Sequence, residues 1–129
     1  MNDGPAINLP DVLAEVAQVF ARYEDALVNN RIDVLDELFW PSAQTVRYGV
    51  AENLVGIDAI RAFRSARPAS GLARALAHTV ITTYGRDFAT AMTEFVREGQ
   101  PGRGRQSQTW VRFAEGWRVV AAHVSRLGG

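Results

Sequence analysis

The sequence predicts an α+β fold in which a curved, mostly antiparallel sheet wraps around N-terminal helices and encloses an internal pocket. Apolar residues recur at helical spacing in the first half of the chain, whereas from about residue 72 they alternate with polar ones, as in strands. Short glycine-containing turns divide this second half into four long segments, a pattern typical of an antiparallel meander. Because long strands twist and curl, helices are expected to cover the concave face of such a sheet.

The first half is predicted to contain three helices and a short strand pair. Pro10 begins the first helix, whose apolar stripe runs from Val12 to Leu27 and ends before Asn29. Pro41 and Pro68 end the other two helices, because proline cannot donate the next helical hydrogen bond. The expected later helices span residues 32–39 and 58–67, and the expected strand pair spans residues 44–48 and 54–55.

The second half is predicted to form the meander. The expected strands span residues 73–84, 87–98, 104–114 and 117–127. Residues 10–129 are therefore expected to form one domain, and residues 1–9 a flexible N-terminal arm.

Composition excludes several function classes. The 129-residue chain has no formal net charge, which gives no reason to expect nucleic-acid or anionic-membrane partners. It has no cysteine, and all 14 of its basic residues are arginine, so thiolate nucleophiles and Schiff-base lysines are excluded. The N-terminus lacks the features of a signal peptide, and no apolar run has the length of a membrane span. We therefore expect a soluble, cytoplasmic protein.

The last predicted hairpin carries polar side chains among its apolar ones. Buried amide or imidazole groups cost about 1–3 kcal/mol each if they lack partners, so a small polar ligand is one expected partner for them. A two-residue Glu115–Gly116 turn places Gln108 opposite His123. A three-residue turn with a bulge instead moves His123 to the other face of the sheet. In both registers Gln106 and Gln108 share a face with Trp110.

Two further side chains are predicted to point inward. Tyr23 lies on the apolar stripe of the first helix, either as a core tyrosine or as a phenol donor in a pocket. Arg47 alternates with Val46 and Tyr48, so it faces the interior if those two residues face outward. A buried arginine needs an anion, which is either Glu94 on a neighbouring strand or a ligand.

Other charged and metal-binding patterns are less specific. Arginines cluster around the third helix and the segment that follows it, either as a solvated face or as a funnel for an anionic substrate. Two histidines without a third ligand at suitable spacing do not indicate a metal site. The clustered arginines are Arg61, Arg64, Arg67 and Arg74.

Several segments resemble a known family. FW at 39–40, VRYG at 46–49, GRQSQTW at 104–110 and GWRVVAAHVS at 116–125 resemble the AtzH/HpxZ-type proteins of the SnoaL-like, nuclear-transport-factor-like superfamily. The resemblance covers about residues 10–127 and implies a cone-shaped α+β fold. Proteins of this type accompany amidases in the breakdown of cyanuric acid and of oxalurate, and the chain is compatible with either branch.

The cyanuric acid branch implies a decarboxylase that converts 1,3-dicarboxyurea to allophanate without a metal or organic cofactor. The resemblance places the two catalytic positions at Tyr23 and Arg47. The chemistry of the reaction then suits Tyr23 as the proton donor and Arg47 as the cation that binds a carboxylate. A homodimer or homotetramer and a functional link to an amidase are also expected. The expected substrate-binding residues are Trp40, Arg74, Gln106, Gln108 and His123.

Two other functions remain open at the level of sequence. A non-catalytic, oligomeric accessory protein that binds an anionic intermediate for a partner amidase would need Arg47 but not Tyr23 as an acid. An isomerase or hydrolase would need a carboxylate base, for which Glu94 is the candidate.

Overall fold

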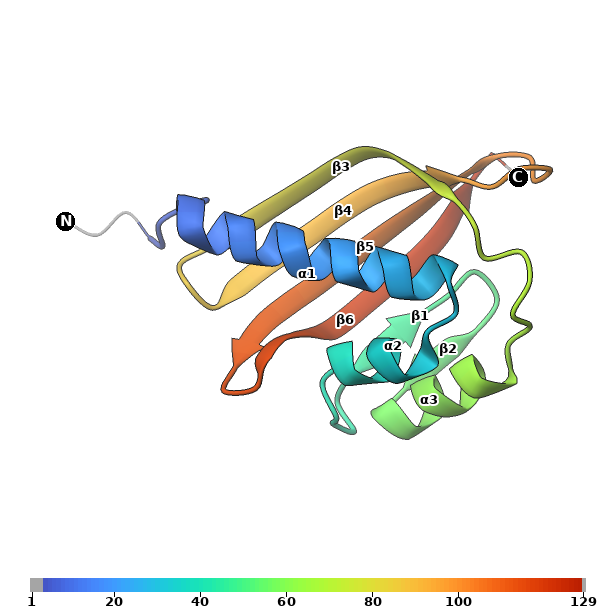
Figure 1. Cartoon of the computed structure of the whole chain (residues 1–129), viewed down its shortest axis with the longest axis horizontal. Coiled ribbons are helices and arrows are strands. Elements are labelled where there is room, and N and C mark those ends of the chain that lie inside the picture. Colours follow the sequence, from blue (N-terminus) through green and yellow to red (C-terminus); the bar gives the residue numbers. More distant parts are fainter. Residues whose placement is uncertain (1–3, 129) are drawn as a thin grey trace.

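A computed structural model describes residues 4–128, and it has the predicted α+β architecture. One six-stranded sheet, in the order β2-β1-β6-β5-β4-β3, curves around the N-terminal helices (Figure 1). The helices are α1 (Pro10–Val28), α2 (Ile32–Leu38) and α3 (Ile57–Ala66). The strands are β1 (Val46–Tyr48), β2 (Asn53–Val55), β3 (Ala75–Tyr84), β4 (Phe88–Val96), β5 (Arg103–Phe113) and β6 (Gly116–Leu127). Every predicted element is present, with ends that differ by a few residues.

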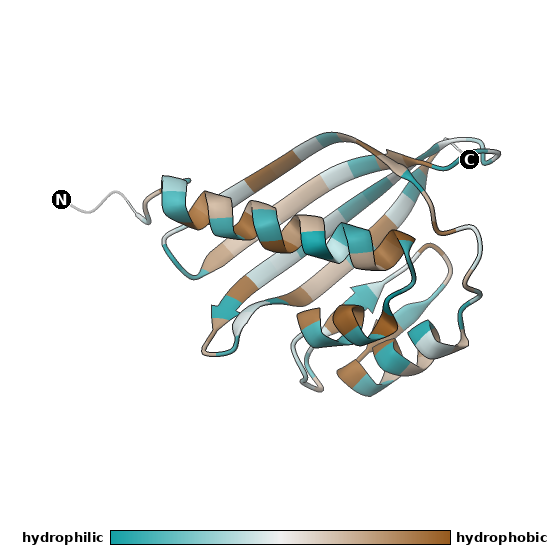
Figure 2. Ribbon diagram, in the orientation of Figure 1, coloured by the Kyte–Doolittle hydropathy of each residue, from teal (hydrophilic) through white to brown (hydrophobic). Residues whose placement is uncertain are grey.

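Helix α1 lies across the concave face of the sheet, while α2 and α3 lie beside β1 and β2 (Figure 1). Its buried side chains recur every three or four residues, which places them on one face. Polar and apolar residues alternate along α1 and along the strands (Figure 2). Among the helices within residues 4–128, none is both long and apolar enough to cross a membrane.

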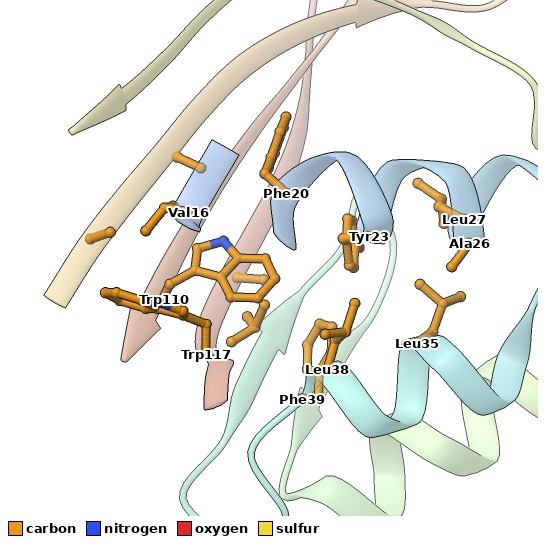
Figure 3. Close-up of a cluster of buried hydrophobic side chains, with 14 of the residues drawn as sticks. Val16, Phe20, Tyr23, Ala26, Leu27, Leu35, Leu38, Phe39, Trp110 and Trp117 are labelled. Carbon is orange, nitrogen blue, oxygen red and sulfur yellow. The ribbon is translucent and has the colours of Figure 1, made fainter. Parts of the chain in front are cut away.

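The core lies between α1, α2 and the inner face of β4–β6 (Figure 3). Trp110 of β5 is completely buried, and its indole meets the Tyr23 ring edge-on with centroids 6.3 Å apart. The ring of Phe39 lies 6.2 Å from that of Tyr23. The body of the Tyr23 side chain is therefore part of the core.

Bulges in β3 and β6 interrupt the strand pairing. In β3 the register shifts between Ala77 and Val80. In β6 it shifts opposite Thr109 and Trp110 of β5. A bulge adds one residue to one strand and increases its bend and twist, which suits a sheet that wraps around a helix.

The pairing of β1 decides which way Arg47 points. Strand β1 runs antiparallel to β2, with Arg47 opposite Leu54, and parallel to β6, with Arg47 beside Ala122. The predicted pairing of the two short strands is therefore confirmed. Ala122 is buried on the inner face of β6, so Arg47 lies on that face too, while Tyr48 is exposed.

The turn of the β5–β6 hairpin differs from both predicted turns. Ala114 and Glu115 form a two-residue turn that pairs Phe113 with Gly116, and the bulge in β6 then shifts the register. Gln108 consequently lies opposite Ala122, and His123 lies on the other face of the sheet, as was predicted for the three-residue turn with a bulge.

Part of the expected N-terminal arm is bound to the sheet. The backbone N–H of Asn8 donates to the carbonyl of Thr83, and the N–H of Gly85 donates to the carbonyl of Ala6. Residues 1–3 of that arm lie outside the described residues. The segment next to α1 therefore continues along the edge strand β3.

Candidate active site

A cavity of about 310 Å³ lies between α1, β1, α3 and the inner face of the sheet. The loop that joins α3 to β3 and the ends of β4 and β6 complete its wall. Cationic, amide and apolar side chains line it together with one carboxylate. The main lining residues are Tyr23, Leu27, Arg47, Glu52, Phe63, Arg67, Leu72, Arg74, Phe95, Arg97, Gln106, Val124 and Arg126.

The structure brings Tyr23 and Arg47 to this one cavity. Helix α1 supplies Tyr23 from its buried face, and β1 supplies Arg47 by the alternation of its strand. Among the described residues, the Tyr23 hydroxyl has no hydrogen-bond partner, although the residue is only 4% exposed. The phenol is thus free to donate to a molecule in the cavity.

Arg47 pairs with a carboxylate other than the predicted one. Its guanidinium donates to Glu52 at 3.0 Å and lies 5.5 Å from the centroid of the Phe63 ring. Glu94 instead lies on the outer face of β4, where it pairs with Arg103 at 3.2 Å. The predicted Arg47–Glu94 pair is therefore wrong, because the strand alternation places Glu94 on the opposite side of the sheet.

Arg74 lines the cavity but already has a partner. It forms a bidentate ion pair with Glu24 of α1, with N–O distances of 2.8 and 2.7 Å. It also donates to Oε1 of Gln106 at 3.0 Å. The amide nitrogen of Gln106 is buried and has no partner among the described residues, so it is available to a ligand.

Two other arginines carry unpaired donors in this region. Nε and one terminal nitrogen of Arg67, and Nε of Arg97, are buried without a hydrogen-bond partner among residues 4–128. Burial lowers the pKa of Arg67, and the neighbouring Arg64 and Arg47 lower it further. Burial also lowers the pKa of Arg97, together with the charges of Arg74 and other arginines. An anion in the cavity would satisfy these donors and relieve this repulsion.

Arg67 belongs to the arginine cluster that was predicted around α3, whereas Arg97 was not predicted as a site residue. A signal for Arg97 was present, since it continues the alternation of the inward-facing Thr93 and Phe95. The Phe95 ring then positions two guanidinium groups, with Arg74 4.5 Å and Arg97 5.0 Å from its centroid.

Gly104 makes room for the Phe95 ring on the neighbouring strand. The two residues pair directly across β4 and β5, and a Cβ atom on Gly104 would lie 2.1 Å from a ring carbon of Phe95. We expect Gly104→Ala to lower the free energy of unfolding by about 1–3 kcal/mol, because the ring must move. Urea denaturation measures the effect, with Arg105→Ala on the outer face as control. Equal stability of the two variants would contradict this packing role.

The family model for AtzH-like proteins matches residues 5–129. The chain belongs to the AtzH-like family. The family resemblance that the motifs predicted is therefore confirmed. Comparison of this AtzH-like protein with curated proteins gives no match.

Solved structures share the fold of this AtzH-like protein. A protein of unknown function from Pectobacterium atrosepticum is 61% identical, with a TM-score of 0.93 and 95% of each chain covered. A cystatin-like fold protein from Burkholderia xenovorans is 48% identical, with a TM-score of 0.93 over 98% of this chain and 99% of that one. A nuclear transport factor 2-like superfamily protein from Salmonella enterica is 25% identical, with a TM-score of 0.74 over 92% and 93% of the two chains. The predicted superfamily fold is confirmed.

Three of the expected substrate-binding residues of this AtzH-like protein do not line the cavity. Trp40 stacks on Phe113 with ring centroids 5.4 Å apart, beside a separate surface hollow. His123 lies on the outer face of the sheet, where its ring meets that of Tyr48 at 5.8 Å. Gln108 is buried on the inner face of β5, two residues beyond the cavity-lining Gln106. Its side-chain oxygen accepts a hydrogen bond from the Trp110 indole at 3.1 Å. The bulge in β6 accounts for the position of His123, because it changes which residues of β6 face inward.

The AtzH-like cavity has the chemistry of an anion-binding site with a proton donor. Five arginines line it, while Glu24 and Glu52 neutralise two of them, Arg74 and Arg47. Its apolar residues restrict water, which strengthens each remaining electrostatic contact. The arrangement suits a small acid whose reaction requires proton transfer to a heteroatom.

Proposed function

We propose that this AtzH-like protein is a cofactor-independent decarboxylase that converts 1,3-dicarboxyurea to allophanate, a step in cyanuric acid catabolism. The observation that carries the proposal is the Tyr23 phenol, which has no hydrogen-bond partner among the described residues, in a cavity with a surplus of guanidinium groups. The substrate is a small dianion with a carboxylate on each urea nitrogen, so it matches the charge of this cavity. Family membership supports the same pathway.

Proton transfer to nitrogen is the central step of the proposed reaction. The bond between the urea nitrogen and the departing carboxylate breaks, and its electron pair remains on nitrogen. The Tyr23 phenol donates its proton to that nitrogen, carbon dioxide leaves, and a proton from solvent restores the phenol. Arg64 and Arg67 stabilise the transient phenolate, in agreement with the attraction of the phenol for each guanidinium, which acts to raise the pKa of both arginines against the effect of burial.

The remaining cavity groups orient the substrate in this mechanism. Arg47 binds the carboxylate that leaves, but its ion pair with Glu52 at 3.0 Å partly neutralises the charge of the guanidinium. This arrangement matters because a strong cation on the departing carboxylate would stabilise the ground state more than the transition state. The free amide N–H of Gln106 donates to the urea carbonyl. Phe63 and Leu72 form part of the apolar wall that excludes water.

Release of carbon dioxide from freshly generated 1,3-dicarboxyurea tests the proposal directly. We expect the wild-type protein to accelerate this release well above the uncatalysed rate, without added metal or cofactor. If wild type gives no acceleration but still binds the anion, the protein is the non-catalytic accessory protein of an amidase instead. If carbon dioxide is released only from a carboxylated apolar compound, the assignment of 1,3-dicarboxyurea as the substrate is wrong.

The Arg47→Ala variant should lose substrate binding more than turnover. We expect kcat/KM to fall by about 10- to 100-fold, since hydrogen bonds to charged groups contribute roughly 1.5–3 kcal/mol. Steady-state kinetics of carbon dioxide release measure the change, with Arg61→Ala on the exposed side of α3 as the matched control. An unchanged kcat/KM in Arg47→Ala would remove this residue from the site.

A further inference from the structure

The end of the cavity near Arg97 has an excess of positive charge, and no carboxylate of residues 4–128 pairs with Arg97. Among the described residues, no ion pair joins Arg97 to an acidic group, and its Nε is buried without a partner. The neighbouring Arg74 is already neutralised by the bidentate contact with Glu24. Arg126, also in the lining, donates to Gln100 at 2.9 Å and to the Pro101 carbonyl at 2.6 Å. No carboxylate of residues 4–128 forms an ion pair with Arg97 or Arg126, and of these two only Arg97 has a buried donor without a partner.

Different elements supply Tyr23 and Arg97 to the cavity, and Arg67 interacts with both. Tyr23 reaches the cavity from α1, close to Phe39 and Trp110 in the core. Arg97 reaches it from the segment after β4, against the ring of Phe95. The cations that act on Arg97 are Arg74, Arg126 and Arg67, whereas the Tyr23 phenol acts on Arg64 and Arg67.

The two ends differ in the freedom of their cations. At one end Arg47 is tied to Glu52 at 3.0 Å, and at the other Arg97 stacks on Phe95 with a donor left unused. A guanidinium that is stacked and partly buried is already desolvated and oriented, so a carboxylate gains most of the interaction when it binds. Arg97 is therefore suited to bind the carboxylate that stays on the substrate. Arg47 is suited to bind the carboxylate that leaves as carbon dioxide.

We propose that the cavity has two anion subsites and that Arg97 holds the carboxylate that the substrate retains. This inference rests on the proposed decarboxylase function, because only decarboxylation distinguishes a retained carboxylate from a departing one. The binding of two anionic groups does not depend on turnover. The site consequently selects small dicarboxylates over the corresponding monocarboxylates that lack the second carboxylate. The product is a monoanion that has lost its contact with the Arg47 end, so it binds more weakly than the substrate and leaves.

Binding of an unreactive dicarboxylate tests the two subsites without any chemistry. Glutarate has the same number of atoms between its carboxylates as 1,3-dicarboxyurea, and butyrate is its monocarboxylate counterpart. We expect isothermal titration calorimetry of the wild-type protein to give at least about tenfold tighter binding of glutarate than of butyrate, since each ion pair adds a charge-assisted hydrogen bond. Absence of saturable glutarate binding, or equal affinity for both acids, would overturn the proposal.

Substitution of Arg97 assigns the second subsite. Arg97→Gln should weaken glutarate binding by at least about tenfold, to the level of butyrate, and Arg97→Lys should recover part of it because the charge remains. Arg105→Gln makes the same change on the exposed face of β5 and should bind glutarate like wild type. Wild-type affinity in Arg97→Gln would show that Arg97 is not a subsite.

The same variants separate failure of this inference from failure of the proposed function. Arg97-dependent glutarate binding without carbon dioxide release would contradict the decarboxylase and leave the dicarboxylate site in place. Normal decarboxylation by Arg97→Gln, with an unchanged KM for 1,3-dicarboxyurea, would support the decarboxylase and overturn the role of Arg97.

Discussion

Tyr23→Phe is expected to slow carbon dioxide release from 1,3-dicarboxyurea by about 10²–10⁴-fold, the range that a positioned general acid contributes. The substitution removes only the hydroxyl, whose proton the departing nitrogen needs, and it keeps the ring that packs 6.2 Å from Phe39 and 6.3 Å from Trp110. The effect should therefore fall on kcat, with little change in the affinity for glutarate. Single-turnover measurement of carbon dioxide release gives the chemical step directly.

Tyr48→Phe is the matched control for this prediction. Tyr48 lies on the exposed face of β1, opposite to the face from which Arg47 enters the cavity, and makes an edge contact with His123. We expect its loss of a hydroxyl to leave the rate unchanged. Retention of wild-type turnover by Tyr23→Phe would exclude Tyr23 as the proton donor and favour an accessory or purely electrostatic role for the cavity.

Trp110→Ala is expected to lower the free energy of unfolding by about 3–5 kcal/mol, the cost of truncating a buried large aromatic side chain. Trp110 is completely buried at the centre of the core, and its indole N–H donates to Gln108 at 3.1 Å. The substitution leaves a cavity and also removes the hydrogen-bond donor that a buried amide oxygen needs. Equilibrium unfolding in urea, followed by circular dichroism, measures the loss.

Trp40→Ala provides the comparison, because Trp40 is only partly buried and stacks on Phe113 at the molecular surface. Its truncation should cost clearly less than that of Trp110. Equal destabilisation by both substitutions would mean that the core does not centre on Trp110. Any loss of substrate affinity in Trp40→Ala would restore the cavity role that the structure does not give it.

Local pattern was sufficient to predict the elements and two of the site residues. The spacing of Val12, Val16 and Phe20 identifies α1, and the same stripe carries Tyr23 into the interior. Strand alternation likewise directs Arg47 inward once Val46 and Tyr48 are assigned to the outer face. These conclusions depend only on the helical and strand periods, which the sequence contains directly.

Pairing between distant segments was not predictable in the same way. Glu94 was the carboxylate predicted for Arg47, but it lies on the outer face of β4, and Glu52, which was not predicted as a partner, is the actual one. The face of the sheet on which His123 lies depends on a single-residue bulge in β6. The residues of the turn do not indicate where that bulge is. A shift of one residue moves every later side chain to the opposite face, so the expected set of pocket residues was partly wrong.

The sequence by itself determined the α+β class, the order of helices and strands, the family resemblance and the inward direction of Tyr23, because these features depend on local period and motif. The direction of Arg47 also required the pairing of β1 with β6. Only the tertiary structure decided which charges remain unpaired. Arg74 is neutralised by Glu24 from α1, whereas Arg67 and Arg97 keep buried donors without partners among the described residues. Charge balance in a cavity is set by side chains that converge from distant segments, and that convergence exists only in the folded chain.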